Sequence, residues 1–405
     1  MTLESLRCRV CESEYPALAT GSCVRCFGPL EPVYDWEAVA REATRDRIEA
    51  GPRSLWRYAP LLPVAAPADA SGGPGWTPLV AAPRLARELG VGELLLKLDH
   101  TNPTHSFKDR VVAVAAAKAA ELATDTLACA STGNLGNAVA ARAAALGMRS
   151  VVLYPTTVEP EKLRATAVYG GELVAVRGSY DVCSRLVVEL ASELDWAFVN
   201  VNLRPYYAEG SKTLAFEIAE QLGWQLPDAV VAPVASGSLF TKLWQGFQQL
   251  ERLGLVEGAL PRLHGGQAAG CSPVAAAFAA GGPVAPVRPA TVAQSLAIGA
   301  PADGDLAVAT AGASGGAIHS VPEGEVGSNM ALLAQASGIF GETAAGVALG
   351  ALRDAVASGR VGSSDRVVLV VTGTGLKTPA AVDVSGAVEI APDVESLLEE
   401  LGVAA

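Results

Sequence analysis

Short apolar segments alternate with helical segments through the central part of the chain, and this alternation restricts the fold more than any other feature. The segments typical of β-strands are 127–130, 150–154, 172–176, 197–201, 229–234 and 367–371. Strands that alternate with helices pair in parallel sheets covered by those helices, and their carboxyl ends form a common edge. The sequence therefore predicts an α/β fold with mostly parallel sheets and with its functional residues at that edge.

The composition fits a large folded body. The chain has 405 residues, of which 50% are hydrophobic and 18% charged, so a large core divided between two lobes is expected. Charged or turn residues interrupt the apolar runs well before the length of a membrane span, and we expect no membrane insertion. The net charge of −12 argues against a nucleic-acid partner, because phosphate backbones would be repelled. The first residues lack a signal-peptide pattern, so we expect a cytoplasmic location.

A polar segment at residues 99–110, with the sequence DHTNPTHSFKDR, contains one lysine, Lys108. Residues 102–104 are typical of a rigid turn, because proline fixes the backbone and its neighbours can bond to the main chain. A helical pattern follows at residues 110–122, and Ser106 stands where an N-cap could lie. Lys108 would then lie at a helix start, either as a solvated charge or as a partly desolvated amine that can bind an aldehyde.

Three further strand-like segments end in polar turns. These turns are residues 131–137 (STGNLGN), 235–238 (ASGS) and 372–377 (TGTGLK). Such turns present main-chain N–H groups and hydroxyls, and where a helix follows, its dipole also favours a bound anion. A turn of this kind can also do no more than cap its own helix. The sequence predicts that these turns, if functional, hold phosphate or carboxylate groups.

In this order, the four segments resemble those of the threonine synthases and of the wider class of fold-type II pyridoxal-phosphate enzymes. The first is similar to the family motif N-P-T-x-S-F-K-D-R and the second to S-T-G-N, and the match covers roughly residues 76–380. The resemblance implies two three-layer α/β/α lobes with mostly parallel sheets. It implies a smaller, mobile lobe at roughly 100–210 and a larger lobe at roughly 76–99 and 211–380.

The resemblance also implies roles for individual residues. Lys108 would bind pyridoxal phosphate covalently and move the protons of the reaction. The neutral hydroxyl of Thr372 would face the pyridine nitrogen. The other implied contacts are Asn134 with the 3-hydroxyl of the cofactor, Ala235, Ser236, Gly237, Ser238 and Leu239 with its phosphate, and Ser131, Thr132 and Gly133 with the substrate carboxylate.

The implied reaction converts O-phospho-L-homoserine and water to L-threonine and phosphate. The chain departs from the family pattern at Tyr207, which replaces an arginine that binds the substrate phosphate in many members, and Arg204 could substitute for it. Two alternatives stay open: a β-replacement enzyme similar to cysteate synthase, acting on O-phosphoserine, and a serine or threonine dehydratase. Glu342 lies in a stretch that resembles the region near the cofactor ring, where it could position a group or cap the helix starting at Thr343.

Two Cys-x-x-Cys pairs near the amino terminus form a separate motif. Four thiolates at this spacing suit one tetrahedral zinc ion, whereas two disulfides would require an oxidising compartment. Zinc ribbons often bind nucleic acid, so a regulatory or nucleic-acid-binding protein with a degenerate enzyme body is a further alternative. No lysine or arginine cluster accompanies this motif, and we therefore favour a structural zinc site. The expected ligands are Cys8, Cys11, Cys23 and Cys26.

The complete expected organisation has four parts. A zinc-ribbon module at residues 1–35 is followed by a helical linker at 36–75, the catalytic region at 76–380 and a carboxyl-terminal tail at 381–405. The expected partners are a small amino-acid substrate and further copies of the chain in a homo-oligomer.

Overall fold

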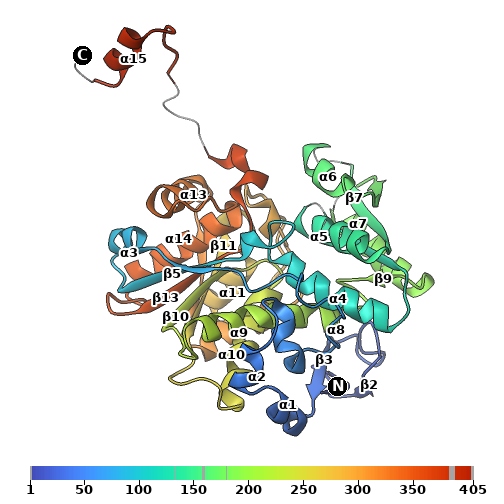
Figure 1. Cartoon of the computed structure of the whole chain (residues 1–405). Coiled ribbons are helices and arrows are strands. Elements are labelled where there is room, and N and C mark those ends of the chain that lie inside the picture. Colours follow the sequence, from blue (N-terminus) through green and yellow to red (C-terminus); the bar gives the residue numbers. More distant parts are fainter. Residues whose placement is uncertain (1, 132, 157–159, 179, 383–387, 403–405) are drawn as a thin grey trace.

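Over the residues that it describes, the computed structural model has three sheets, and helices cover the two larger ones (Figure 1). The structure describes residues 2–131, 133–156, 160–178, 180–382 and 388–402. None of the helices in these ranges has the length and apolar character that a bilayer crossing requires.

The larger sheet has six strands in the order β12-β11-β10-β13-β5-β4, and only β4 runs antiparallel to its neighbour. Central strands such as β13 are continuous apolar runs because both faces of the sheet are buried. The strands are β4 (Leu79–Ala81), β5 (Glu93–Leu98), β10 (Ala229–Pro233), β11 (Arg262–Ala268), β12 (Ala317–Val321) and β13 (Arg366–Val371).

Helices cover both faces of the six-stranded sheet, which gives three layers. One apolar cluster joins the sheet to the face formed by α3, α13 and α14, and a second joins it to α9, α10, α11 and α12. The helices of the first face are α3 (Pro83–Leu89), α13 (Glu323–Ser337) and α14 (Thr343–Ala357). Those of the second are α9 (Lys212–Gln221), α10 (Ser238–Arg252), α11 (Pro273–Ala280) and α12 (Gly304–Ala313).

The smaller sheet has four parallel strands in the order β8-β7-β6-β9, with α4 and α5 on one face and α7 on the other. Its strands are β6 (Thr126–Ala130), β7 (Arg149–Pro155), β8 (Glu172–Val176) and β9 (Ala197–Phe198). Its helices are α4 (Lys108–Glu121), α5 (Asn134–Leu146), α6 (Pro160–Ala167) and α7 (Tyr180–Glu193). The short α8 (Arg204–Tyr207) follows β9 and leads back to the larger sheet. The α/β architecture with mostly parallel strands is thus confirmed.

The amino-terminal sheet is antiparallel, in the order β2-β1-β3; Cys8 ends β1, and the other three cysteines of the motif lie in the loops between the strands. Its strands are β1 (Leu3–Cys8), β2 (Glu14–Pro16) and β3 (Leu30–Tyr34), and α1 (Trp36–Glu42) and α2 (Arg45–Glu49) follow. The short 3-10 helices are η1 (Leu55–Leu61), η2 (Asp99–Thr101), η3 (Ala208–Ser211), η4 (Ala269–Cys271), η5 (Gln294–Leu296), η6 (Gly375–Lys377) and η7 (Pro379–Ala381). Near the carboxyl terminus, α15 (Val394–Glu400) has no buried residue.

Two local expectations were wrong. The helix expected from residue 110 begins two residues earlier, at Lys108, and its N-cap is Phe107 rather than Ser106. The strand expected over 197–201 ends at Phe198, because residues 199–203 turn away to form the link to α8. The first difference matters for function, because it makes Lys108 the first residue of α4.

Candidate functional site

The motif turns lie at carboxyl ends of neighbouring strands. In the larger sheet, β10, β13 and β5 are adjacent and parallel, and they lead into residues 235–238, 372–377 and 99–107. The fourth turn, 131–137, follows β6 of the smaller sheet. Parallel pairing brings three of these turns to one edge, as alternation of strands and helices predicted.

The loop before Lys108 is fixed by its own polar side chains. Thr104 donates from its main-chain N and from Oγ1 to the carboxylate of Asp109, at 2.8 and 2.9 Å. The buried Asn102 donates to the main-chain oxygen of Asp99 at 2.8 Å and accepts from Gly75 N at 2.9 Å. These bonds hold the loop in one conformation, so the position of Lys108 does not depend on a flexible segment.

A buried ionic network anchors the first turn of α4 to the larger sheet. The guanidinium of Arg110 bonds to Asp99 at 2.7 and 2.8 Å and to Glu217 at 2.5 and 2.7 Å, and the amine of Lys97 lies 2.8 Å from Glu217. All four side chains are fully buried. Two cations balance two carboxylates, so the network is neutral while it fixes the residue two positions after Lys108.

The amine of Lys108 lies beside two aromatic side chains. Its Nζ is 3.4 Å from the hydroxyl of Tyr207 and 4.5 Å from the centre of the Phe107 ring. Burial lowers the pKa of Lys108 to about 8, although the carboxylate of Glu342 acts in the opposite direction. An amine with such a pKa is partly unprotonated near neutral pH, which is what capture of an aldehyde requires.

Asn134 links the turn after β6 to the other turns. Its Nδ2 donates to the carboxylate of Glu342 at 3.1 and 3.3 Å, and its Oδ1 accepts from Lys377 Nζ at 2.7 Å. Because an ammonium group only donates, the oxygen of the amide must face Lys377. Lys377 also donates to the main-chain oxygen of Thr104 at 2.6 Å. The amide of Asn134 and the amine of Lys377 thus connect three of the motif segments.

Glu342 faces the site instead of its own helix. It is the N-cap residue of α14, yet its side chain makes no capping bond and instead lies 3.4 Å from Thr372 Oγ1 and beside Asn134. Burial raises its pKa. The sequence left open whether this glutamate caps α14, and the structure shows that it does not. A role for Lys377 was missed, although a lysine directly after a Gly-rich turn at a strand end is a usable signal.

The turn after β10 has the form of an anion site. Gly237, the N-cap residue of α10, has no side chain that could cap the helix, and its φ of +92° lies in the left-handed region. The first N–H groups of a helix have no main-chain partner within it, so this end is able to bind a phosphate. Nearby, Ser131 Oγ accepts from Gly133 N and Gly136 N at 3.1 and 2.9 Å. Thr132 lies outside the described residues.

The residues present fit pyridoxal phosphate, the cofactor that the motifs imply. Lys108 offers an amine of lowered pKa, the start of α10 offers main-chain N–H groups that the side chain of its N-cap residue does not cap, and Asn134 and Thr372 offer polar side chains. The hydroxyl of Ser106, two residues before Lys108, is buried without a hydrogen-bond partner among the described residues. Ser106 forms a β-bridge with Gly373, at the start of the turn after β13. A buried hydroxyl without a partner at this place is consistent with a ligand that brings a polar group to it.

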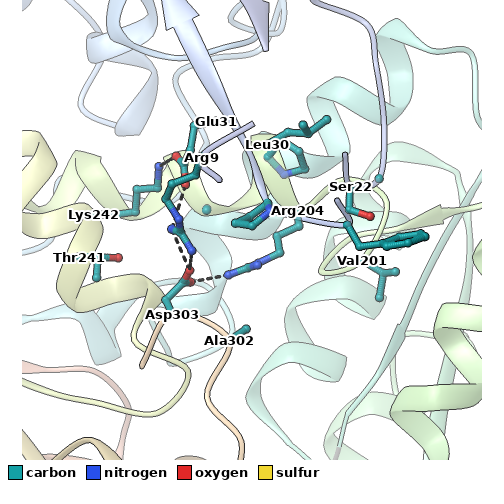
Figure 2. A pocket seen from close by; sticks show the side chains of 15 residues that line it. Arg9, Ser22, Leu30, Glu31, Val201, Arg204, Thr241, Lys242, Ala302 and Asp303 are labelled. Carbon is teal, nitrogen blue, oxygen red and sulfur yellow. Dashed lines mark hydrogen bonds and ion pairs between the residues drawn. The ribbon is translucent and has the colours of Figure 1, made fainter. Parts of the chain in front are cut away.

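Arg204, the residue expected to bind the substrate phosphate, forms an ion pair with Asp303. Its Nη2 is 2.5 Å from Oδ2 of Asp303, and Arg9 of the amino-terminal module bonds to Oδ1 of the same carboxylate (Figure 2). The three side chains line a pocket of about 260 Å³ between the amino-terminal sheet, α8 and α10. Lys108 is not among its lining residues, whereas Tyr207, at the end of α8, contacts the Lys108 amine.

The four amino-terminal cysteines come together as their spacing predicted. All four Sγ atoms lie within 4.8 Å of one another, and the pairs Cys8–Cys26 and Cys11–Cys23 are 3.4 Å apart. All are free thiols, with no disulfide between them. Sulfur atoms around one tetrahedral zinc are about 3.8 Å apart, given Zn–S bonds of about 2.3 Å, so this donor set fits a single zinc ion.

Comparisons with known proteins identify the family of the chain. Residues 70–373 match the family model described as "Pyridoxal-phosphate dependent enzyme". The chain is 35% identical to the threonine synthase of Methanocaldococcus jannaschii over 93% of each protein, and 36% identical to that of Methanosarcina acetivorans, again over 93% of each. Among solved structures, a processed threonine deaminase isoform from Solanum lycopersicum superposes with a TM-score of 0.64, over 77% of this chain and 88% of that one. At 19% identity, that likeness shows the fold alone.

Proposed function

Because the chain belongs to the pyridoxal-phosphate-dependent enzymes and, within them, to the threonine synthases, we propose that it converts O-phospho-L-homoserine and water to L-threonine and phosphate. The observation that carries this proposal is the similarity to two threonine synthases over nearly the whole length of both proteins. The lowered pKa of the Lys108 amine supports it, because the reaction needs a base of moderate pKa that can also bind the cofactor.

The proposal assigns one contact to each residue of the expected site, of which Thr132 lies outside the described residues. Lys108 would bind the cofactor through Nζ, and Asn134 would bond to its 3-hydroxyl. When bound, pyridoxal phosphate supplies an electron sink for the substrate α-carbon. Lys108 Nζ then accepts and returns protons, and the hydroxyl of Tyr207 at 3.4 Å keeps that amine oriented. The remaining contacts are Ala235, Ser236, Gly237, Ser238 and Leu239 with the cofactor phosphate, Thr372 with the ring nitrogen, and Ser131, Thr132 and Gly133 with the substrate carboxylate.

The substrate phosphate needs a cation. Arg204 was the sequence-based candidate, but it would have to leave its ion pair with Asp303 to fill this role. Lys377 lies nearer the other site residues, since it bonds to Asn134 and Thr104. We therefore propose Lys377 as a second candidate, in addition to Arg204, for the contact with the substrate phosphate.

The substrate test compares two phosphorylated amino acids. The purified protein loaded with pyridoxal phosphate should release threonine and phosphate in equal amounts from O-phospho-L-homoserine. Tyr207, in place of the usual arginine, favours one alternative, a β-replacement enzyme similar to cysteate synthase. That alternative predicts that no threonine forms from O-phospho-L-homoserine. It also predicts that a new amino acid forms from O-phosphoserine and sulfite. A serine or threonine dehydratase would instead release ammonia from the unphosphorylated amino acids.

The pH dependence of cofactor binding should follow the lowered pKa of Lys108. Only the unprotonated amine can bind an aldehyde, so cofactor-free protein should bind pyridoxal phosphate faster as pH rises, with a midpoint near pH 8. An ordinary lysine would give a midpoint near 10.4. Because the unfolded chain keeps this proton up to the higher pH, stability should also rise between these two values. Stopped-flow absorbance at a series of pH values would measure the midpoint.

The variant Glu342→Gln tests the carboxylate that opposes this lowering of the Lys108 pKa. The carboxylate of Glu342 raises the pKa of Lys108, so its removal should move the midpoint to lower pH. A midpoint near that of a free lysine in the unaltered protein would show that the amine is not desolvated.

Cys8, Cys11, Cys23 and Cys26 are proposed to hold one structural zinc ion. The purified protein should contain about one zinc per chain. Cys23→Ser should remove the metal and lower the thermal stability of the amino-terminal sheet, whereas Cys129→Ala, in the buried strand β6, should leave the zinc content unchanged. Metal analysis and calorimetry would measure both effects. Purified protein that contains no metal and has these four cysteines paired in disulfides would contradict the proposal.

The same proposal includes a cytoplasmic location and a homo-oligomeric assembly. Light scattering coupled to gel filtration would give the number of subunits.

A further inference from the structure

One carboxylate, that of Asp303, joins three parts of the chain that are far apart in sequence. Oδ1 accepts from Nη1 and Nη2 of Arg9, both at 3.2 Å, and Oδ2 accepts from Arg204 at 2.5 Å (Figure 2). Arg9 belongs to the first cysteine pair of the amino-terminal sheet, and Arg204 is the first residue of α8. The side chain of Asp303 is only 6% exposed, so both ion pairs are largely shielded from solvent on that side.

The main chain of Asp303 supports the turn that is expected to hold the cofactor phosphate. Its N–H donates to the carbonyl oxygen of Ser236 at 2.9 Å. A Cβ at Gly237 would lie 2.6 Å from the carbonyl oxygen of Asp303, so the two backbones are in direct contact. Any movement of residue 303 is therefore transmitted to residues 236 and 237, directly before the first turn of α10.

The orientation of this side chain is unusual for its position. Asp303 is the N-cap residue of α12, where an aspartate normally accepts a hydrogen bond from the start of its own helix. Here it makes no capping bond and points to the two arginines instead. The side chain of Asp303 thus makes two long-range ion pairs instead of a local capping bond. This indicates that its position serves the contact between Arg9, Arg204 and residue 303 rather than the start of α12.

Arg9 is held by the fold of the cysteine pairs. It lies between Cys8 and Cys11, and its main-chain N–H donates to the carbonyl oxygen of Pro29 at 3.0 Å. Its guanidinium also lies 3.4 Å from Glu31 on β3. The position of the Arg9 guanidinium therefore depends on the amino-terminal sheet being folded. Asp303 has one of its two arginine partners only when this sheet is in place.

We propose that Asp303 is a positioning residue through which the amino-terminal sheet, by way of Arg9, fixes residues 235–238 for the phosphate of pyridoxal phosphate. The inference rests on the proposed use of that cofactor. It gives the amino-terminal sheet a role in cofactor binding, and it accounts for Arg204, which links the same carboxylate to the helix that ends at Tyr207.

The test measures equilibrium binding of pyridoxal phosphate, and of pyridoxal, which lacks the phosphate, to cofactor-free protein by absorbance. Arg9→Gln should raise the dissociation constant for pyridoxal phosphate roughly tenfold, the loss expected for one charge-assisted contact, and leave that for pyridoxal nearly unchanged. Arg7→Gln is the matched control, because Arg7 is on β1 of the same sheet but pairs with Glu14 at the surface. It should bind both compounds as the unaltered protein does.

The variant Asp303→Asn distinguishes a positioning role of Asp303 from a simple effect of its charge, because the two predict opposite changes in the affinity for pyridoxal phosphate. If only the charge near the phosphate mattered, removal of a carboxylate would strengthen binding of the anion. A positioning role predicts weaker binding of pyridoxal phosphate. Tighter binding by this variant, or equal loss for pyridoxal and pyridoxal phosphate in Arg9→Gln, would overturn the proposal.

A double variant completes the test. If Arg9 acts through Asp303, then Arg9→Gln combined with Asp303→Asn should weaken binding no more than the stronger single change, whereas independent effects would add. Zinc content and circular dichroism would confirm that each variant is folded. Failure of the unaltered protein to bind pyridoxal phosphate at all would instead remove the proposed function.

Discussion

Lys108→Ala should reduce threonine formation by roughly a thousandfold or more, because the change removes both the covalent partner of the cofactor and the proton-transferring amine. The structure places this amine at the first residue of α4, beside Tyr207 and Phe107, where burial lowers its pKa to about 8. The measurement is the rate of threonine and phosphate release from O-phospho-L-homoserine. The absorbance band of protein-bound cofactor should be lost as well.

The second lysine of the site, Lys377, is the informative control. Borohydride reduction of the loaded protein, followed by peptide mapping, should place the pyridoxyl mass on Lys108. Lys377→Met should keep that label in the same place, since Lys377 bonds to Asn134 and Thr104 and is not expected to bind the cofactor covalently. A label on Lys377, or on no lysine, would contradict the proposed role of Lys108.

Glu217→Gln should lower the free energy of unfolding by about 3–5 kcal/mol, the cost of removing one partner from a buried ion pair. In the folded protein, Glu217 accepts from Arg110 at 2.5 and 2.7 Å and from Lys97 at 2.8 Å, and all three side chains are fully buried. Neutral glutamine would leave two buried cations with only Asp99 as a charged partner. Urea denaturation followed by circular dichroism would measure the loss.

Glu172→Gln is the matched control for this change. Glu172 also pairs with an arginine, Arg149, at 2.6 Å, but both side chains are about half exposed, so solvent screens the pair. The free energy of unfolding of this variant should be close to that of the unaltered protein. Equal, small effects at Glu172 and Glu217 would show that the buried network contributes no more than a surface pair.

Glu217→Gln should also affect the site. Arg110 is two residues from Lys108 on α4, so a weakened network loosens the start of the helix that carries the amine. We expect weaker cofactor binding in the folded variant, in addition to the loss of stability.

The sequence by itself determined the features that depend on short stretches of chain. Continuous apolar strands that alternate with helices are typical of parallel sheets covered by those helices, so the α/β architecture and the placing of motif turns at strand ends followed from local patterns. The cysteine spacing likewise predicted that four thiolates meet. The order of the motifs identified the family, and the relatives confirm it.

Only the tertiary structure decided which distant side chains meet. Arg204 and Asp303 are separated by 99 residues, and Arg9 and Asp303 by 294. Lys377 and Asn134 are separated by 243 residues. Such contacts depend on how two sheets and the amino-terminal module pack, and no local periodicity encodes them. The start of α4 was misplaced for a related reason: Ser106 suits an N-cap by composition, but the bridge to Gly373 and the Arg110 network fix the backbone there instead.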